Sequence, residues 1–145
     1  MSVQAVEAFD RAFLLAARLA EMMSAALSER GLTTARAEVI FVLQRRGALV
    51  QRQLAEALRC SPRQVTALVD ALQETGFVRR GPHPSDRRAT LVELTDQGRT
   101  AARRILRERA AAAEKLLGSA PESQLAGFVA TVDRLVAGLA QGQRR

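Results

Sequence analysis

The segment SPRQVTALVDALQETG, from Ser61 to Gly76, carries clear signals for both the start and the end of a short helix. Ser61 and Gln64 match a capping box, in which each side chain accepts a hydrogen bond from the other residue's backbone N–H, and Pro62 suits the first helical position. Gly76 suits the left-handed turn that ends many helices. The polar residues of the first turns stay outside, and one apolar face is expected to be buried, formed by Val65, Leu68, Val69 and Leu72.

Two shorter helices are expected before this segment. Thr33 or Thr34 can cap the first of them, which ends near Gly47 and buries Val39, Ile40, Val42 and Leu43. The second runs from Gln51 to Arg59 and buries Leu54, Ala55 and Leu58, but its start is poorly marked because Val50 lies where a polar cap is usual. This helix and the capped helix, joined around Cys60, form a helix-turn-helix.

After Gly76 the apolar pattern changes from helical to alternating. Phe77–Arg80 and Thr90–Leu94 read as two strands, joined by the basic sequence GPHPSDRRA, whose two prolines exclude a regular helix. The pattern therefore predicts a β-hairpin, or wing, with Arg87 and Arg88 at its exposed tip. Guanidinium groups there could enter a narrow minor groove of DNA, where the potential is most negative, although exposed charge runs are often only solvated.

The two ends of the chain read as longer helices. The first ends near Gly31 and carries an apolar stripe for packing against a helix of the same chain or of a partner, formed by Phe9, Phe13, Ala16, Ala20, Met23 and Leu27. A later helix runs from Thr95 to about Leu117. Ser119-Ala120-Pro121-Glu122 reads as a second capping box that opens an apolar last helix, and the tail from Gln141 to Arg145 is expected to be frayed.

Composition argues against several classes of function. The net charge is +7, and all but one of the 22 basic residues are Arg, which favours a polyanionic partner but also fits a solvated surface. One His, one Cys and the absence of Tyr and Trp leave few catalytic or metal-binding groups, so no enzyme, metal site or cofactor is expected. Without an apolar run long enough to cross a bilayer, or a signal peptide, the expected location is the cytoplasm, with no membrane partner.

The run LAEALRCSPRQVTALVDALQETGFVRRGPHPSDRRATLVELTDQGR, from Leu54 to Arg99, resembles the MarR family of winged helix-turn-helix bacterial transcription regulators. The resemblance rests on "DRRA" followed by "VELTDQGR", after a helix that ends "ALQETGFVRR". It implies a mainly α fold with a small β-hairpin wing. The expected parts are an N-terminal dimerisation helix (1–32), a winged helix-turn-helix DNA-binding lobe (33–95) and C-terminal dimerisation helices (96–145), interwoven as a single domain.

The resemblance also implies roles for particular residues. The helix from Ser61 to Gly76 would be the recognition helix, Arg88 would insert into the minor groove, and Asp86 would steady the wing. The residues expected at the DNA are Gln51, Arg52, Ser61, Pro62, Arg63, Gln64, Thr66, His83, Ser85, Asp86, Arg87 and Arg88.

The same resemblance implies a homodimer that binds a pseudo-palindromic operator in double-stranded DNA and controls transcription. Repression is the expected effect. A small anionic or aromatic effector would release the DNA, and its candidate anchors are Arg11, Arg18 and Arg36. Two alternatives remain open at this level. One is a winged helix that binds another protein instead of DNA, and the other is a regulator that senses oxidation through Cys60.

Overall fold

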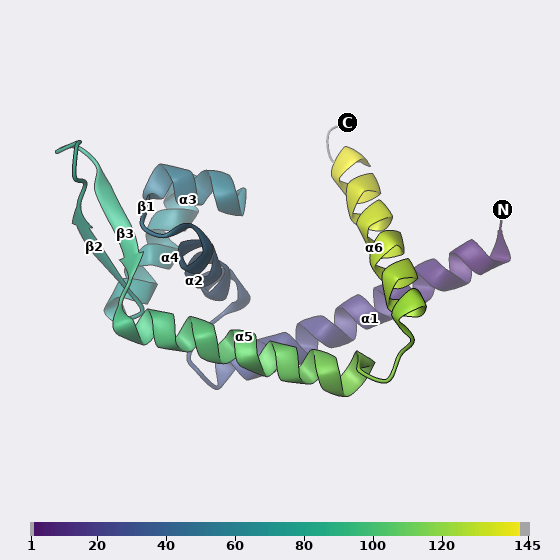
Figure 1. Cartoon of the computed structure of the whole chain (residues 1–145). Helices are drawn as coiled ribbons and strands as arrows, with labels where there is room; N and C mark the ends of the chain where they lie inside the picture. Colours follow the sequence, from purple (N-terminus) through teal and green to yellow (C-terminus); the bar gives the residue numbers. More distant parts are fainter. Residues whose placement is uncertain (1, 143–145) are drawn as a thin grey trace. The chain divides into compact units, whose positions relative to one another are not determined.

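The computed structural model describes residues 2–142 of the chain, and Figure 1 labels its helices and strands. The helices are α1 (Val3–Ser28), α2 (Thr34–Arg46), α3 (Gln51–Leu58), α4 (Pro62–Glu74), α5 (Asp96–Leu117) and α6 (Glu122–Gly142). The strands are β1 (Leu49–Val50), β2 (Val78–Pro82) and β3 (Thr90–Leu94). The backbone divides into two compact units, one ending at Arg103 and the other beginning at Arg104. The mainly helical fold with a small sheet confirms the expected fold class.

The first unit has its core where α2, α3 and α4 pack beside the sheet (Figure 1). Thr33 is the cap of α2, since its side-chain oxygen accepts from the backbone N–H of Arg36 at 3.2 Å. The four side chains expected to face inward from α2 are all buried, namely Val39, Ile40, Val42 and Leu43. They meet the apolar face of α4, where Val65, Val69 and Leu72 are buried. The apolar periods therefore identified most of this core.

Strand β1 was not predicted. Its two residues pair antiparallel with β3, so the sheet has the order β1-β3-β2. Val50 is also the residue before α3, and its backbone N–H donates to the side-chain oxygen of Gln53 at 3.1 Å. This bond gives α3 half of a capping box although Val50 has no polar side chain. A two-residue strand has too short a pattern to be read from sequence, and here it fixes the start of α3 against the wing.

The hairpin differs from the expected one at the start of β2. Phe77 was assigned to the strand, but its backbone N–H donates to the carbonyl of Leu72 at 2.9 Å and so belongs to the end of α4. At the other end β2 extends to Pro82, opposite Thr90. Proline is tolerated there because β2 is an edge strand, whose outward N–H groups need no partner in the sheet.

The start of α5 packs closely on the turn that ends α4. Gly76 adopts a left-handed φ of 86°, and its carbonyl accepts from the Thr95 hydroxyl at 2.5 Å. A Cβ added at Gly98 would lie 2.1 Å from the carbonyl oxygen of Phe77, so only glycine fits there without movement. Arg99 donates to the Asp96 carboxylate and attracts it, which lowers the pKa of Asp96. The contacts of Gly76 and Gly98 thus join the turn after α4 to the start of α5.

The last helix begins later than the sequence suggested. Helix α6 starts at Glu122, and the carbonyl of Pro121 accepts from the N–H groups of Gln124 and Leu125 at 3.0 and 3.1 Å. The predicted capping box at Ser119 is therefore wrong, because Pro121 holds the capping position and has no side-chain acceptor. Helix α6 includes Gln141 and Gly142, so fraying from Gln141 was also wrong for these two residues. The rest of that tail, residues 143–145, lies outside the described residues.

Helices α1 and α6 leave most of their large apolar side chains exposed in the single chain. In α1 only Leu27 is buried, while Phe13 of the predicted stripe is 72% exposed. In α6 no residue is buried. The exposed apolar side chains of α6 are Phe128, Val129, Val132, Leu135, Val136 and Leu139. Such extensive apolar exposure is unusual for a soluble monomer and marks an interaction surface.

Candidate nucleic-acid interface

The start of α4 has the geometry that its sequence predicts. The Ser61 hydroxyl accepts from the Gln64 backbone N–H at 3.2 Å, and Oε1 of Gln64 accepts from the Ser61 N–H at 2.9 Å. Pro62 is the first residue of the helix. The predicted capping box is confirmed. With the opposite face of α4 in the core, Arg63 and Thr66 remain exposed on its first turns.

Thr66 is joined to the first residue of α3. Nε2 of Gln51 donates to the Thr66 hydroxyl oxygen at 3.0 Å, and the Thr66 hydroxyl donates to the Pro62 carbonyl at 3.0 Å. Gln51 and Thr66 were both expected at the DNA, but a bond between them was not. The fold thus brings the starts of α3 and α4 together on one surface.

Arg80 of β2 stabilises this surface by hydrogen bonds to side chains of α3 and α4. Sequence reasoning did not identify this role. Nε and Nη2 of Arg80 each donate to Oε1 of Gln51 at 3.1 Å. Nη2 also donates to Asp70 at 2.6 Å and Nη1 to Gln73 at 2.5 Å, both on α4. A sequence signal existed, because Arg80 lies two residues after the buried Val78 and thus shares its face of the strand. An arginine on an inward face has to find acceptors there.

Arg79, the neighbouring residue, points to the other side of β2 and pairs across the sheet with Glu93 at 2.7 Å. Its side chain is 63% exposed, whereas that of Arg80 is 25% exposed. Two adjacent arginines therefore have different structural roles, as the alternation of a strand requires.

The tip of the wing is shaped by hydrogen bonds from side chains to the backbone. Nδ1 of His83 accepts from the N–H groups of Ser85 and Asp86, each at 3.1 Å. Oδ1 of Asp86 accepts from the N–H of Arg88 at 2.9 Å. Asp86 thus steadies the wing, and His83 does so as well, which sequence reasoning missed. Between them they hold the loop that exposes Arg87 and Arg88.

The four exposed arginines of this surface are available to a partner. Arg52 of α3, Arg63 of α4, and Arg87 and Arg88 of the wing are all exposed. Within residues 2–142 none of their guanidinium groups makes an ion pair with a carboxylate. Guanidinium forks of this kind suit phosphate oxygens and guanine edges.

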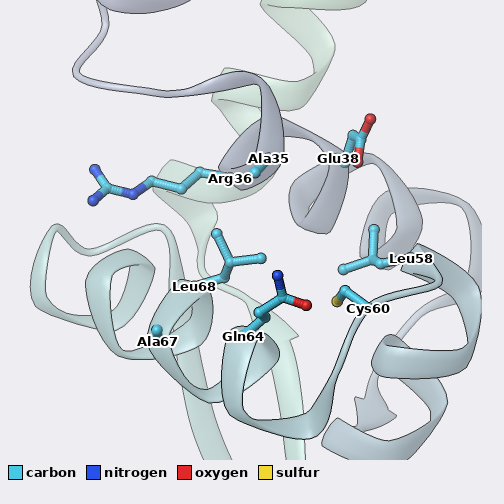
Figure 2. Close-up of a pocket in the computed structure, with 8 residues that line it drawn as sticks. All are labelled: Ala35, Arg36, Glu38, Leu58, Cys60, Gln64, Ala67 and Leu68. Carbon is cyan, nitrogen blue, oxygen red and sulfur yellow. The ribbon is translucent and has the colours of Figure 1, made fainter.

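A hollow of about 390 Å³ lies beside α4, on the edge away from Thr66. Figure 2 shows Gln64, Leu68, Leu58 and Cys60 around it, with Arg36 extending along one side. Leu58 and Leu68 were expected in the core but are only half-buried, because they line this open space. Gln64 likewise faces the hollow, while its oxygen is used by the capping box. Ala35, Glu38 and Ala67 complete the lining.

The three candidate effector anchors lie in two different settings. Arg11 and Arg18 are exposed on α1, where they pair with Glu7 at 3.5 Å and Glu21 at 3.2 Å. Arg36 instead borders the hollow. Cys60, which lines the same space, is half-buried, and it is the only cysteine of the chain.

None of the helices in residues 2–142 is both long enough and apolar enough to cross a membrane. No group of three or more His, Cys, Asp and Glu side chains in that range could hold a metal ion.

Comparison with known proteins shows what this part of the chain resembles. The model of the MarR family matches residues 32–90, which run from the loop before α2 to the first residue of β3. The HTH-type transcriptional repressor MdtR of Bacillus subtilis is 27% identical over 103 residues, covering 71% of this chain and 66% of the relative. The HTH-type transcriptional regulator PecS of Dickeya dadantii is 32% identical over 74 residues, covering 49% and 45%. The matches thus span about half to two thirds of the relatives' length.

Solved structures extend the similarity of fold to nearly the whole chain. The crystal structure of Streptococcus pneumoniae FabT in complex with DNA matches with a TM-score of 0.82 and 19% identity, over 97% of this chain and 99% of that one. At this identity the match shows a shared fold, including the helices outside the winged lobe.

Proposed function

We propose that the chain is a member of the MarR family, whose model matches residues 32–90, and that it is a sequence-specific double-stranded DNA-binding regulator of transcription. The observation that carries the proposal is one surface of the first unit. There the capped start of α4 and the wing tip each expose arginines without carboxylate partners. The names of MdtR and PecS agree with this function.

In the proposed complex the first turns of α4 enter the major groove. Arg63, Pro62 and Thr66 contact base edges, while Arg88 of the wing enters the adjacent minor groove. Phosphate and sugar contacts, which fix the register of a protein on DNA, fall to the surrounding residues. These residues are Gln51, Arg52, Ser61, Gln64, His83, Ser85 and Arg87.

The protein acts as a homodimer in this proposal. The exposed apolar faces of α1 and α6 support the homodimer, because a second copy would bury many of their large apolar side chains away from water. A two-fold dimer would present its two α4 helices about one DNA turn apart, on the order of 34 Å. A pseudo-palindromic operator follows from that symmetry.

Repression with release by a small molecule is the regulatory form of the proposal. Of the three candidate anchors we favour Arg36, because it borders a hollow that also contains apolar side chains, whereas Arg11 and Arg18 have acidic partners. A small carboxylate with an apolar body suits such a site. Bound there, it would contact Gln64 and so act on the start of α4. The protein is further proposed to be cytoplasmic and to have no catalytic activity.

The test is binding of the purified protein to the duplex upstream of its own coding region, compared with a scrambled duplex across a salt series. A specific-to-scrambled ratio above about a thousandfold near physiological salt is expected. Arg63→Ala should reduce the specific binding by roughly 1–3 kcal/mol, and Arg107→Ala on α5 is the control of equal charge.

Random duplexes are tested in parallel, to cover an operator at another place in the genome. Equal and steeply salt-dependent binding to all duplexes would reject an operator-binding regulator. A winged helix that binds another protein would then be the better explanation.

A further inference from the structure

The hydrogen bonds around Gln51 leave only one orientation for its amide group. A guanidinium group can donate hydrogen bonds but cannot accept them. Because Nε and Nη2 of Arg80 both point to one atom of the Gln51 amide, at 3.1 Å, that atom has to be the oxygen. The amide nitrogen therefore faces Thr66, to which it donates at 3.0 Å.

The same reasoning fixes the Thr66 hydroxyl. A backbone carbonyl only accepts, so the single hydroxyl hydrogen of Thr66 is used in the 3.0 Å bond to Pro62. The hydroxyl oxygen also accepts from Gln51. What remains of this exposed side chain without a partner is chiefly its methyl group.

Arg80 is itself hydrogen-bonded to two side chains of α4, and these bonds fix the position of the guanidinium group that donates to Gln51. Asp70 and Gln73 accept from its two terminal nitrogens at 2.6 and 2.5 Å. The guanidinium group is thus anchored on α4 before it reaches Gln51 on α3. Arg80 acts as a positioning residue that sets the direction of the bonds from β2 to the exposed surface.

We infer that this chain of bonds makes Thr66 read a thymine by contact between methyl groups, and makes Gln51 a donor only. The inference rests on the proposed DNA-binding function and specifies it. Thymine carries a methyl group in the major groove, whereas a glutamine reads adenine by donating and accepting together. Gln51 cannot read adenine in that way while Arg80 occupies its oxygen. Its remaining N–H suits a phosphate oxygen or a base acceptor.

The test begins with selection of preferred duplexes by the wild-type protein from a random pool. Each thymine of the selected site is then replaced by uracil, which differs only in lacking the methyl group. At the position read by Thr66 this replacement is expected to weaken binding about fourfold, the effect of one buried methyl group.

Two substitutions separate the methyl group from the hydroxyl group. Thr66→Val keeps a methyl and removes the hydroxyl, so it should retain both the affinity and the preference for thymine over uracil. Thr66→Ser keeps the hydroxyl and should bind the two duplexes equally. The reverse result, with binding lost in Thr66→Val and the thymine preference kept in Thr66→Ser, would overturn the inference.

Arg80→Met tests the positioning role. The substitution frees the Gln51 oxygen, so adenine should become acceptable to Gln51. The preference for thymine over adenine at the Thr66 position should then weaken. A purely structural role would lower all affinities together and leave base preferences unchanged. Arg80→Lys can donate to Gln51 but lacks the guanidinium fork, so it should keep part of the preference for thymine over adenine that Arg80→Met loses.

Failure of this inference is distinguishable from failure of the proposed function. A wild-type protein that selects no sequence would overturn both. A wild-type protein that selects a sequence, yet binds every uracil duplex as well as the thymine duplex, would overturn only the reading by Thr66.

Discussion

Nδ1 of His83 accepts a hydrogen bond from the backbone N–H of Asp86 at 3.1 Å, across the turn at the tip of the wing. A second N–H, that of Ser85, points to the same nitrogen at 3.1 Å. Both groups are donors, so Nδ1 carries no proton, and the proton of the neutral ring lies on Nε2. The ring thus shapes the loop through Nδ1, and its Nε2–H remains a hydrogen-bond donor.

His83→Ala should therefore loosen the wing tip without unfolding the lobe. Loss of the shared acceptor removes roughly 1 kcal/mol of local stability, so the N–H groups of Ser85 and Asp86 should exchange with deuterium about fivefold faster. His83→Asn offers an oxygen in a similar place and serves as the matched control. Unchanged exchange rates in His83→Ala would show that the loop holds its shape by other means.

Arg88→Ala should weaken specific binding by about 1–3 kcal/mol, and mainly on operators whose flanks are rich in A·T. The physical reason is that a narrow minor groove concentrates negative potential around an inserted guanidinium group. The measurement is affinity on duplexes that differ only in their flanks, with Arg107→Ala as the control of equal charge. Equal losses on all flanks would leave Arg88 as a phosphate contact.

Arg80 and Arg79 offer a matched pair for a stability test. Arg80→Met should lower the free energy of unfolding by about 2 kcal/mol, because Gln51, Asp70 and Gln73 lose a charged donor. Arg79→Met removes one exposed ion pair and should cost no more than about 1 kcal/mol. Denaturant unfolding of both variants, with circular dichroism as the probe, measures the difference. Equal losses would contradict the role assigned to Arg80.

Gly98→Ala should destabilise the first unit by about 1–3 kcal/mol, because the new Cβ would overlap the carbonyl oxygen of Phe77. Gly81→Ala in β2 is the control, since a Cβ there meets nothing within 4 Å. Thermal unfolding of the two variants gives the comparison. A Gly98→Ala protein as stable as the wild type would mean that α5 can shift away from the turn without cost.

Phe13→Asp should dissociate the proposed homodimer, raising its Kd at least about a hundredfold, because a charge would be buried at an apolar contact. Gln4→Asp, also exposed on α1 but off the predicted stripe, is the control for the added charge. Sedimentation at micromolar concentration would measure both. A wild-type protein that sediments as a folded monomer would reject the dimer itself.

Sequence reasoning succeeded where a structural feature depends on neighbours along the chain. The capping box at Ser61, the cap at Thr33 and the left-handed glycine at the end of α4 all depend on residues within about four positions. It failed at Ser119, where the spacing of a capping box was present but Pro121 took the capping position of α6.

The sequence by itself determined the order of the helices, the hairpin after α4 and the exposed arginines at its tip, because caps, turn residues and apolar periods act over short distances. Only the tertiary structure decided which polar atoms remain available. Gln51 lies 15 residues before Thr66 and 29 residues before Arg80 along the chain, and Gln64 faces a hollow formed with α2 and α3. Hydrogen bonds are directional, so their pattern depends on how separate elements pack, which no local pattern encodes.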